Sequence, residues 1–239
     1  QIFFQSQLDF IYFFYGLAFV FLGMICFLLK RQYKFGPPWR WLGWFGVLHG
    51  LNEWADMVNL IIIYQDWYAI FRLLLLIVSF GCLLEFARQD FNNRKIFRVG
   101  MWVYTLIALI LFFVWWNYGL PEVNIFVRYI LGVGGAFGAA LAFVRFSSLS
   151  REYKIKFYIG AGAFCFYGLS QFLIPSGQIP FIELTNQAAF FDYFGFPIQL
   201  VRAFLAVCIS ICIWQHYQWV VFKEFKEQQI VRRKTIGNQ

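Results

Sequence analysis

Long apolar runs, each about as long as a membrane-spanning helix, recur along the whole chain. A helix that crosses the hydrocarbon layer needs roughly 20 apolar residues, because only helices and closed barrels pair every backbone polar group in lipid. With 61% hydrophobic and 13% charged residues and a mean hydropathy of +0.63, the composition is far from that of a soluble domain. The sequence predicts an all-α, polytopic membrane bundle of about seven transmembrane helices, at Leu8 to Leu29, Trp41 to Ile63, Tyr68 to Ala87, Val99 to Trp116, Asn124 to Val144, Ile155 to Leu173 and Pro197 to Trp219.

The positive charge of the chain follows the predicted spans. All but three of the 20 Lys and Arg residues lie in clusters that come after every second span, and the positive-inside rule places such clusters in the cytoplasm. We therefore expect the N-terminus outside and the C-terminus in the cytoplasm. Separate clusters of this form indicate topology and not a nucleic-acid surface, so no nucleic-acid partner is expected. The clusters are Lys30, Arg31, Lys34 and Arg40; Arg88, Arg94, Lys95 and Arg98; Arg145, Arg151, Lys154 and Lys156; and Lys223, Lys226, Arg232, Arg233 and Lys234.

A polar stripe interrupts the second apolar run. His49, Asn52, Glu53 and Asp56 are three or four residues apart, so on a helix they share one face. Ionisable groups in a bilayer are costly unless they are paired or hydrated, and they usually face a bundle interior or mark a site. This stripe is the strongest indication of a functional site in the sequence.

Three arginines, Arg72, Arg128 and Arg202, lie inside predicted spans instead of in the basic clusters. Counting 1.5 Å per residue along the helices places them in the outer half of the membrane, where Glu53 and Asp56 also fall. Two interpretations are open. The charges can form a structural network that holds the helices in register. Alternatively, all seven polar residues line an outward-facing pocket, in which an excess positive charge favours a ligand with a carboxylate or similar anionic head.

Cofactor and enzyme interpretations are weaker. His49 with Glu53 and Asp56 is a conceivable metal site, and His49 is a conceivable haem ligand, but the other histidine, His216, falls at the opposite end of its span. We expect no metal and no cofactor. The spans contain no Ser/His/Asp set and no metalloprotease motif, so this region is not expected to be an enzyme.

Two segments outside the spans carry further expectations. The long connection from Ile174 to Phe196 contains an amphipathic stretch, Leu184 to Tyr193, which predicts either a short helix capping the outer side of the bundle or a plain loop. After Trp219 the sequence becomes charged, and the last helix is expected to continue into the cytoplasm. The predicted organisation is therefore a transmembrane domain, residues 1–219, and the start of a signalling helix or linker, residues 220–239, through which a homodimer is expected.

The stretches Gly46 to Met57 and Arg72 to Arg88 resemble the N-terminal multi-pass membrane domain of certain bacterial signalling proteins. In those proteins the domain precedes cytoplasmic PAS, histidine kinase or diguanylate cyclase modules. The resemblance implies a sensory input domain in the bacterial cytoplasmic (inner) membrane, as in two-component systems. Its expected partners are membrane lipid and a small or lipophilic ligand, and its last helix would carry the signal inward. A small transporter or permease, or an accessory helical subunit of a membrane complex, are the alternatives.

Overall fold

The computed structural model is helical throughout the part of the chain that it describes, residues 2–32, 37–61, 66–93, 98–147, 154–173 and 186–237. Within these ranges there is no strand, which confirms the predicted all-α class. Four residues of the basic clusters, and the connection 174–185 with Leu184, lie outside the described ranges. Those four residues are Lys34, Arg94, Lys95 and Arg151.

Each predicted span overlaps helical residues, and the span predicted at Asn124 to Val144 covers parts of three consecutive helical elements. Among the described residues, four helical stretches are long and apolar enough to cross a membrane, namely Leu8–Arg31, Asp66–Asn92, Leu120–Ser147 and Ile198–Lys226. The chain therefore has the character of a membrane protein. The helices are α1 (Ile2–Gln5), α2 (Leu8–Gln32), α3 (Trp39–Asn59), α4 (Asp66–Asn92), α5 (Trp102–Tyr118), α6 (Leu120–Val127), the π-helix η1 (Arg128–Val133), α7 (Gly134–Ser147), α8 (Lys154–Ser170), α9 (Gln187–Phe194) and α10 (Ile198–Gly237).

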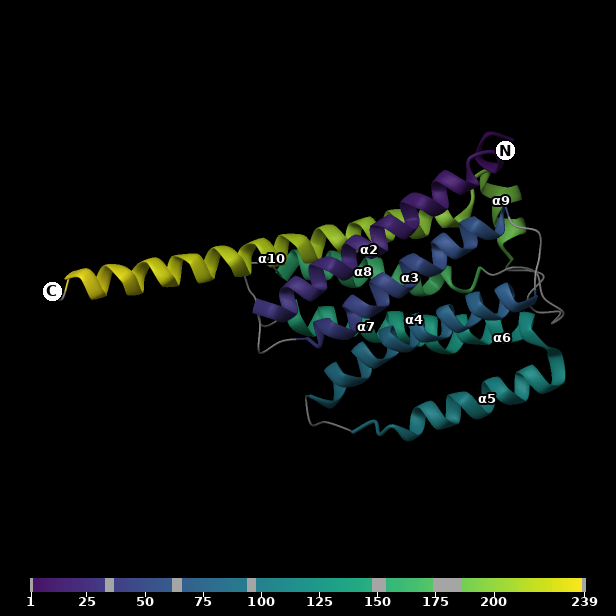
Figure 1. Ribbon diagram of the computed structural model, residues 1–239, viewed down its shortest axis with the longest axis horizontal. Coiled ribbons are helices and arrows are strands. Elements are labelled where there is room, and N and C mark those ends of the chain that lie inside the picture. The colour runs from purple at the N-terminus through teal and green to yellow at the C-terminus, as the bar shows by residue number, and fades with distance from the viewer. Residues whose placement is uncertain are drawn as a thin grey trace.

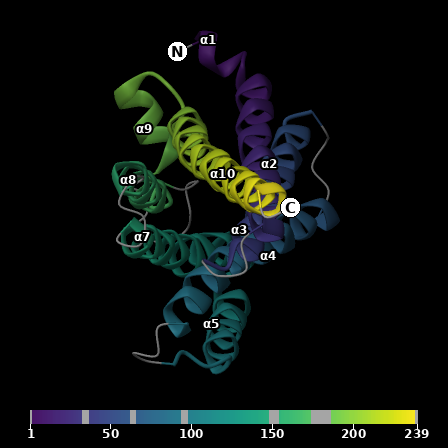
Figure 2. The same ribbon diagram turned by 90° about the vertical axis from the view of Figure 1, so that its left-hand side faces the viewer.

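The helices close into a ring around a common core. Each of α2, α3, α4, α7, α8 and α10 packs against the next, and α10 returns to α2 (Figure 2). α5 lies outside this ring and packs mainly on α6, so α4 and α7 become neighbours although α5 separates them in the sequence (Figure 1). The interior of the ring is where side chains from distant parts of the chain meet.

Glycine permits the closest helix contacts. A Cβ atom on Gly46 of α3 would lie 2.6 Å from the backbone nitrogen of Gly23 on α2, closer than real side chains approach. The sequence also predicts close packing at Gly134 and Gly138 of α7. Gly138 does lie against Ala87 of α4, but Gly134 meets no neighbouring atom within 4 Å. The small residue that joins Gly138 in this contact is Gly135, beside Leu83.

Two glycines with positive φ shape connections between helices. Gly119, at φ 99°, ends α5 and lets the chain reverse directly into α6. Gly195, at φ 78°, ends α9, and the Asn186 side chain begins that helix by accepting a hydrogen bond from the Ala189 amide at 2.6 Å. The described part of the amphipathic stretch is therefore a short helix, which was one of the two alternatives that the sequence left open.

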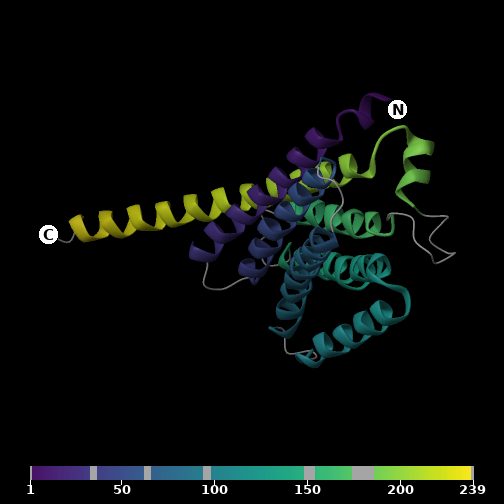
Figure 3. The ribbon, with the colours of Figure 1, turned by 45° about the vertical axis from the view of Figure 1, so that its right-hand side comes forward.

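α10 is much longer than the other helices. It runs without interruption for 40 residues and extends well beyond the end of the bundle (Figures 1 and 3). The predicted continuation of the last helix beyond Trp219 is confirmed. At 1.5 Å per residue the helix is about 60 Å long.

Candidate functional site

The imidazole of His49 lies at the centre of a polar core within the ring. It is completely buried, and it joins three helices. Its Nδ1 lies 3.2 Å from the Ser79 hydroxyl on α4, and its Nε2 lies 2.7 Å from the Tyr167 hydroxyl on α8 and 3.3 Å from a Glu53 carboxyl oxygen on α3. Ser79 donates its own hydrogen to the Leu76 carbonyl at 2.9 Å, so it accepts from His49 and Nδ1 carries a proton.

Aromatic rings enclose this imidazole. The ring of Phe19 lies 4.7 Å away edge-on, Phe80 lies 4.9 Å away, and Phe45 stacks at 5.2 Å. All three are fully buried. The surroundings hold water away from the hydrogen bonds of His49, and in such a medium these bonds are stronger and their loss is more costly.

The buried guanidinium of Arg202 is held by the end of α8 and not by a carboxylate. It donates to the Ser170 hydroxyl at 3.2 Å, to the Ser170 carbonyl at 2.6 Å and to the Leu173 carbonyl at 2.7 Å. Ser170 is the last residue of α8, and its carbonyl also accepts from the Leu173 amide at 3.1 Å in the turn that follows. A cation at a helix C-terminus is favoured by the helix dipole. Arg202 thereby ties α10 to the end of α8.

Arg128 is also bonded to neutral groups. Its guanidinium donates to the side-chain oxygens of Asn124, at 3.0 Å, and Gln171, at 3.2 Å. It is the first residue of η1, where the chain takes π-helical geometry, an arrangement that is frequent at functional sites. Both Arg128 and Arg202 lie within electrostatic range of Glu53.

Asp56 and Arg72 form a direct ion pair between α3 and α4. The Arg72 Nε lies 2.6 Å from the Asp56 carboxylate, and the pair is partly exposed. Asn52 is buried beside Glu53. The seven predicted residues are therefore distributed over one buried core and one ion pair at its edge. Among them the ion pair is Asp56 with Arg72, and Glu53 lies within contact distance of His49.

Sequence reasoning missed several members of this core. Tyr167, Ser79, Ser170 and Gln171 supply the hydroxyl and amide groups that bind the predicted residues. The sequence gives only a weak indication that these residues belong to the core, because single hydroxyl or amide side chains inside apolar helices are common. Glu122, in α6, is also completely buried.

A cavity of about 370 Å³ opens beside the polar core at the end of the bundle where α10 begins, between α2, α9 and the start of α10. Gln199 of α10 donates to the Tyr12 hydroxyl at 3.0 Å and to the Gln187 side chain at 3.2 Å. Tyr12 in turn lies within electrostatic range of Glu53, Asp56 and Arg202. The cavity thus adjoins the polar core through Tyr12. Its lining residues are Leu8, Tyr12, Leu60, Gln187, Ala188, Phe191, Asp192, Pro197 and Gln199.

The two histidines belong to different surroundings. His216 of α10 lies among aromatic rings, with Phe157 at 5.0 Å, Phe146 at 5.3 Å and Trp39 at 6.0 Å, while His49 lies in the polar core. Within the described ranges, no group of three or more His, Cys, Asp or Glu side chains has an arrangement suited to a metal ion.

Comparison of the chain with known protein families, with curated proteins and with solved structures found no match.

Proposed function

We propose that this chain is the membrane sensory input domain of a bacterial signalling protein, located in the cytoplasmic membrane. A small ligand binds at the outer end of the bundle, and α10 passes the change to an output module in the cytoplasm. The observation that carries this proposal is the continuity of α10. One uninterrupted helix includes Gln199 at the outer cavity, Arg202 in the polar core and the extension beyond the bundle.

A rigid helix of about 60 Å transmits a displacement at one end to the other. Shifts of about 1–2 Å between packed helices are a common form of signal transmission. Arg202 fastens α10 to the last turn of α8, and Gln199 links it to Tyr12 and Gln187, so a ligand that disturbs these bonds changes how α10 sits on its neighbours. A transporter needs an access path to both faces, and the continuous helix favours a sensor.

The proposed topology has seven spans, with the N-terminus outside. The helix ends that carry the described basic residues, including the end of α2, the start of α3 and the ends of α4 and α7, lie on the side from which α10 projects (Figure 1). α3 falls short of the hydropathy of a typical span because His49, Asn52 and Glu53 lower it, and these side chains are buried inside the ring. The positive-inside rule supports a cytoplasmic position for the α10 extension.

The cavity lining favours a small amphipathic ligand with a neutral or cationic polar group. Its volume falls within the range usual for small-molecule sites, about 300–1,000 Å³. Gln187 and Gln199 offer amide groups, Asp192 offers a carboxylate, and no arginine or lysine lines the cavity as described. This differs from the anionic ligand expected from the sequence, since the arginines are engaged within the core.

The test measures whether a change in the hydrogen bonds beside the outer cavity moves α10. Spin labels are placed on two exposed residues toward the inner side, Arg31 of α2 and Lys226 of α10, in a cysteine-free chain in nanodiscs. Distances between the labels are measured by pulsed electron paramagnetic resonance. Gln199→Leu removes the bonds to Tyr12 and Gln187, and Asp9→Asn is an outer-end control that does not line the cavity. We expect a shift of about 1–2 Å for Gln199→Leu alone. Identical distance distributions in both variants would refute the relay.

A further inference from the structure

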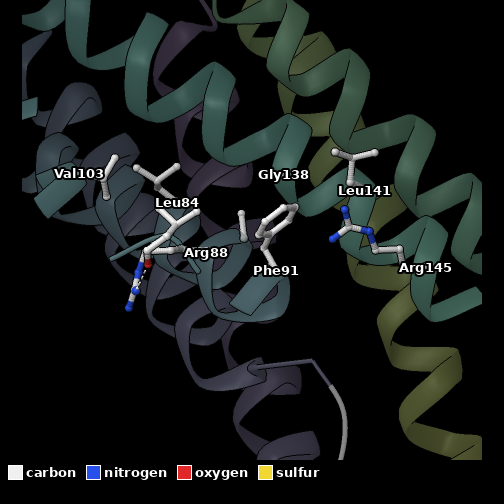
Figure 4. Close-up of a pocket in the computed structure, with 9 residues that line it drawn as sticks. Leu84, Arg88, Phe91, Val103, Gly138, Leu141 and Arg145 are labelled. Atoms are coloured by element: carbon white, nitrogen blue, oxygen red, sulfur yellow. Dashed lines mark hydrogen bonds between the residues drawn. The ribbon is translucent and has the colours of Figure 1, made fainter. Parts of the chain in front are cut away.

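A second cavity lies at the other end of the bundle, between α4, α5 and α7 (Figure 4). This cavity, the α4–α5–α7 groove, has a volume of about 190 Å³. It arises because α5 stands off from the ring, with only Ile107 and Val114 buried, while Gly138 holds α7 close to α4. Its lining residues are Leu84, Ala87, Arg88, Phe91, Val99, Val103, Gly138, Leu141 and Arg145.

The walls of the groove are suited to hydrocarbon. Leu84, Val103 and Leu141 come from three different helices and present only aliphatic groups. A protein cavity of about 150 Å³ lined by apolar side chains stays dry and accepts a benzene ring, so the α4–α5–α7 groove has room for several methylene groups of an acyl chain. Leu141 is 55% exposed, which places the groove at the surface of the bundle where lipid would lie.

Two guanidinium groups mark one end of the groove. Arg88 is fixed there by two hydrogen bonds to Glu85, at 2.6 and 2.7 Å, and by one to the Val99 carbonyl at 2.8 Å. Arg145 lies 5.2 Å above the Phe91 ring and 3.5 Å from the Asp90 carboxylate, and its side chain is 27% exposed. A phosphate oxygen can therefore reach the exposed part of this guanidinium at the usual charge-assisted distance of about 2.7–2.9 Å.

The groove and its arginines match the two parts of a phospholipid, with apolar walls for an acyl chain and guanidinium groups for the phosphate. Arg88 lies near the end of α4 and Arg145 near the end of α7, and both helices end on the side from which α10 projects (Figure 1). Leu84 and Leu141 lie one turn earlier in the same helices. Basic pockets between transmembrane helices at the cytoplasmic side bind anionic headgroups. We propose that the α4–α5–α7 groove binds an anionic phospholipid of the cytoplasmic leaflet, with one acyl chain against Leu84, Val103 and Leu141 and the phosphate on Arg145. This site is separate from the outer cavity and uses the proposed topology only to name the leaflet.

Native mass spectrometry of the whole chain, released from nanodiscs that contain equal amounts of phosphatidylglycerol and phosphatidylcholine, tests this site. Arg145→Gln removes the phosphate contact, and Arg40→Gln is the matched control at the same end of the bundle. Leu141→Trp fills the groove, and Leu109→Trp is its control on the exposed face of α5. Addition of glycerol phosphate, which has no acyl chain, distinguishes the lipid from a free phosphate group.

We expect Arg145→Gln to reduce retained phosphatidylglycerol about fivefold, the effect of about 1 kcal/mol for one arginine near a membrane surface, with little change in phosphatidylcholine. Leu141→Trp should reduce both lipids, and glycerol phosphate should displace neither. Equal lipid retention in Arg145→Gln and Arg40→Gln, or in the two tryptophan variants, would overturn the proposal, as would displacement by glycerol phosphate. This experiment measures lipid retention and not signal output. A negative result would therefore count against the lipid site alone, and the sensory proposal has a separate test.

Discussion

Tyr167→Phe removes a single oxygen atom from the polar core. That hydroxyl lies 2.7 Å from Nε2 of His49, and both residues are completely buried. A buried polar group that loses its partner costs about 1–3 kcal/mol, although hydrogen bonds between transmembrane helices average about 0.6 kcal/mol. Because aromatic rings exclude water from His49, we expect a loss of about 1–2 kcal/mol in the free energy of unfolding.

The assay is reversible unfolding in mixed micelles, followed by circular dichroism. Tyr158→Phe is the matched control, because it removes the same atom from the same helix at a position that is 46% exposed, and it should change stability by less than about 0.5 kcal/mol. In a His49→Leu background the effect of Tyr167→Phe should become much smaller, since the partner is absent. Equal effects of the two Tyr→Phe changes, or an undiminished effect in the His49→Leu background, would refute a central role for this bond.

The same unfolding assay checks three further predictions. Gly46→Ala should cost about 1–3 kcal/mol, because its Cβ would meet the α2 backbone at 2.6 Å, whereas Gly81→Ala has open space and should cost nothing. Arg202→Gln should cost about 2–4 kcal/mol, because it leaves the carbonyls of Ser170 and Leu173 without their charged donor. Arg72→Gln should cost less than about 1 kcal/mol, because its ion pair is partly exposed; a larger loss than for Arg202→Gln would contradict this ranking.

Much of the helical architecture follows from local pattern. The apolar run from Leu8 predicts a helix that the structure places at Leu8–Gln32, and the charged continuation after Trp219 predicts an extension that the structure carries to Gly237. Such runs are informative because a backbone in an apolar medium has few alternatives to a helix. The burial of His49, Asn52 and Glu53 likewise agrees with the expectation that intramembrane polar groups face the bundle interior.

The composition of the polar core was much less predictable. Counting depth along helices placed Asp56 and Arg72 at similar levels, and they do pair. The same counting placed Arg202 in the half of the membrane that holds the carboxylates, whereas in the structure it bonds to the carbonyls of Ser170 and Leu173. Depth says nothing about which helices are neighbours, and backbone carbonyls at a helix end have no signature in the side-chain sequence. Glu122 was missed because Gly119 allows α6 to begin immediately after α5.

The sequence by itself therefore determined the helical class, the position of each long helix and the polar residues that must be buried, because these depend on length, hydropathy and helical periodicity. Only the tertiary structure decided that α4 adjoins α7 while α5 stands outside, that His49 meets Ser79 and Tyr167, and that cavities remain at the two ends. The physical reason is that these features depend on the order of helices around the ring. That order is set by close approaches such as Gly46 to Gly23, which join residues far apart in the chain.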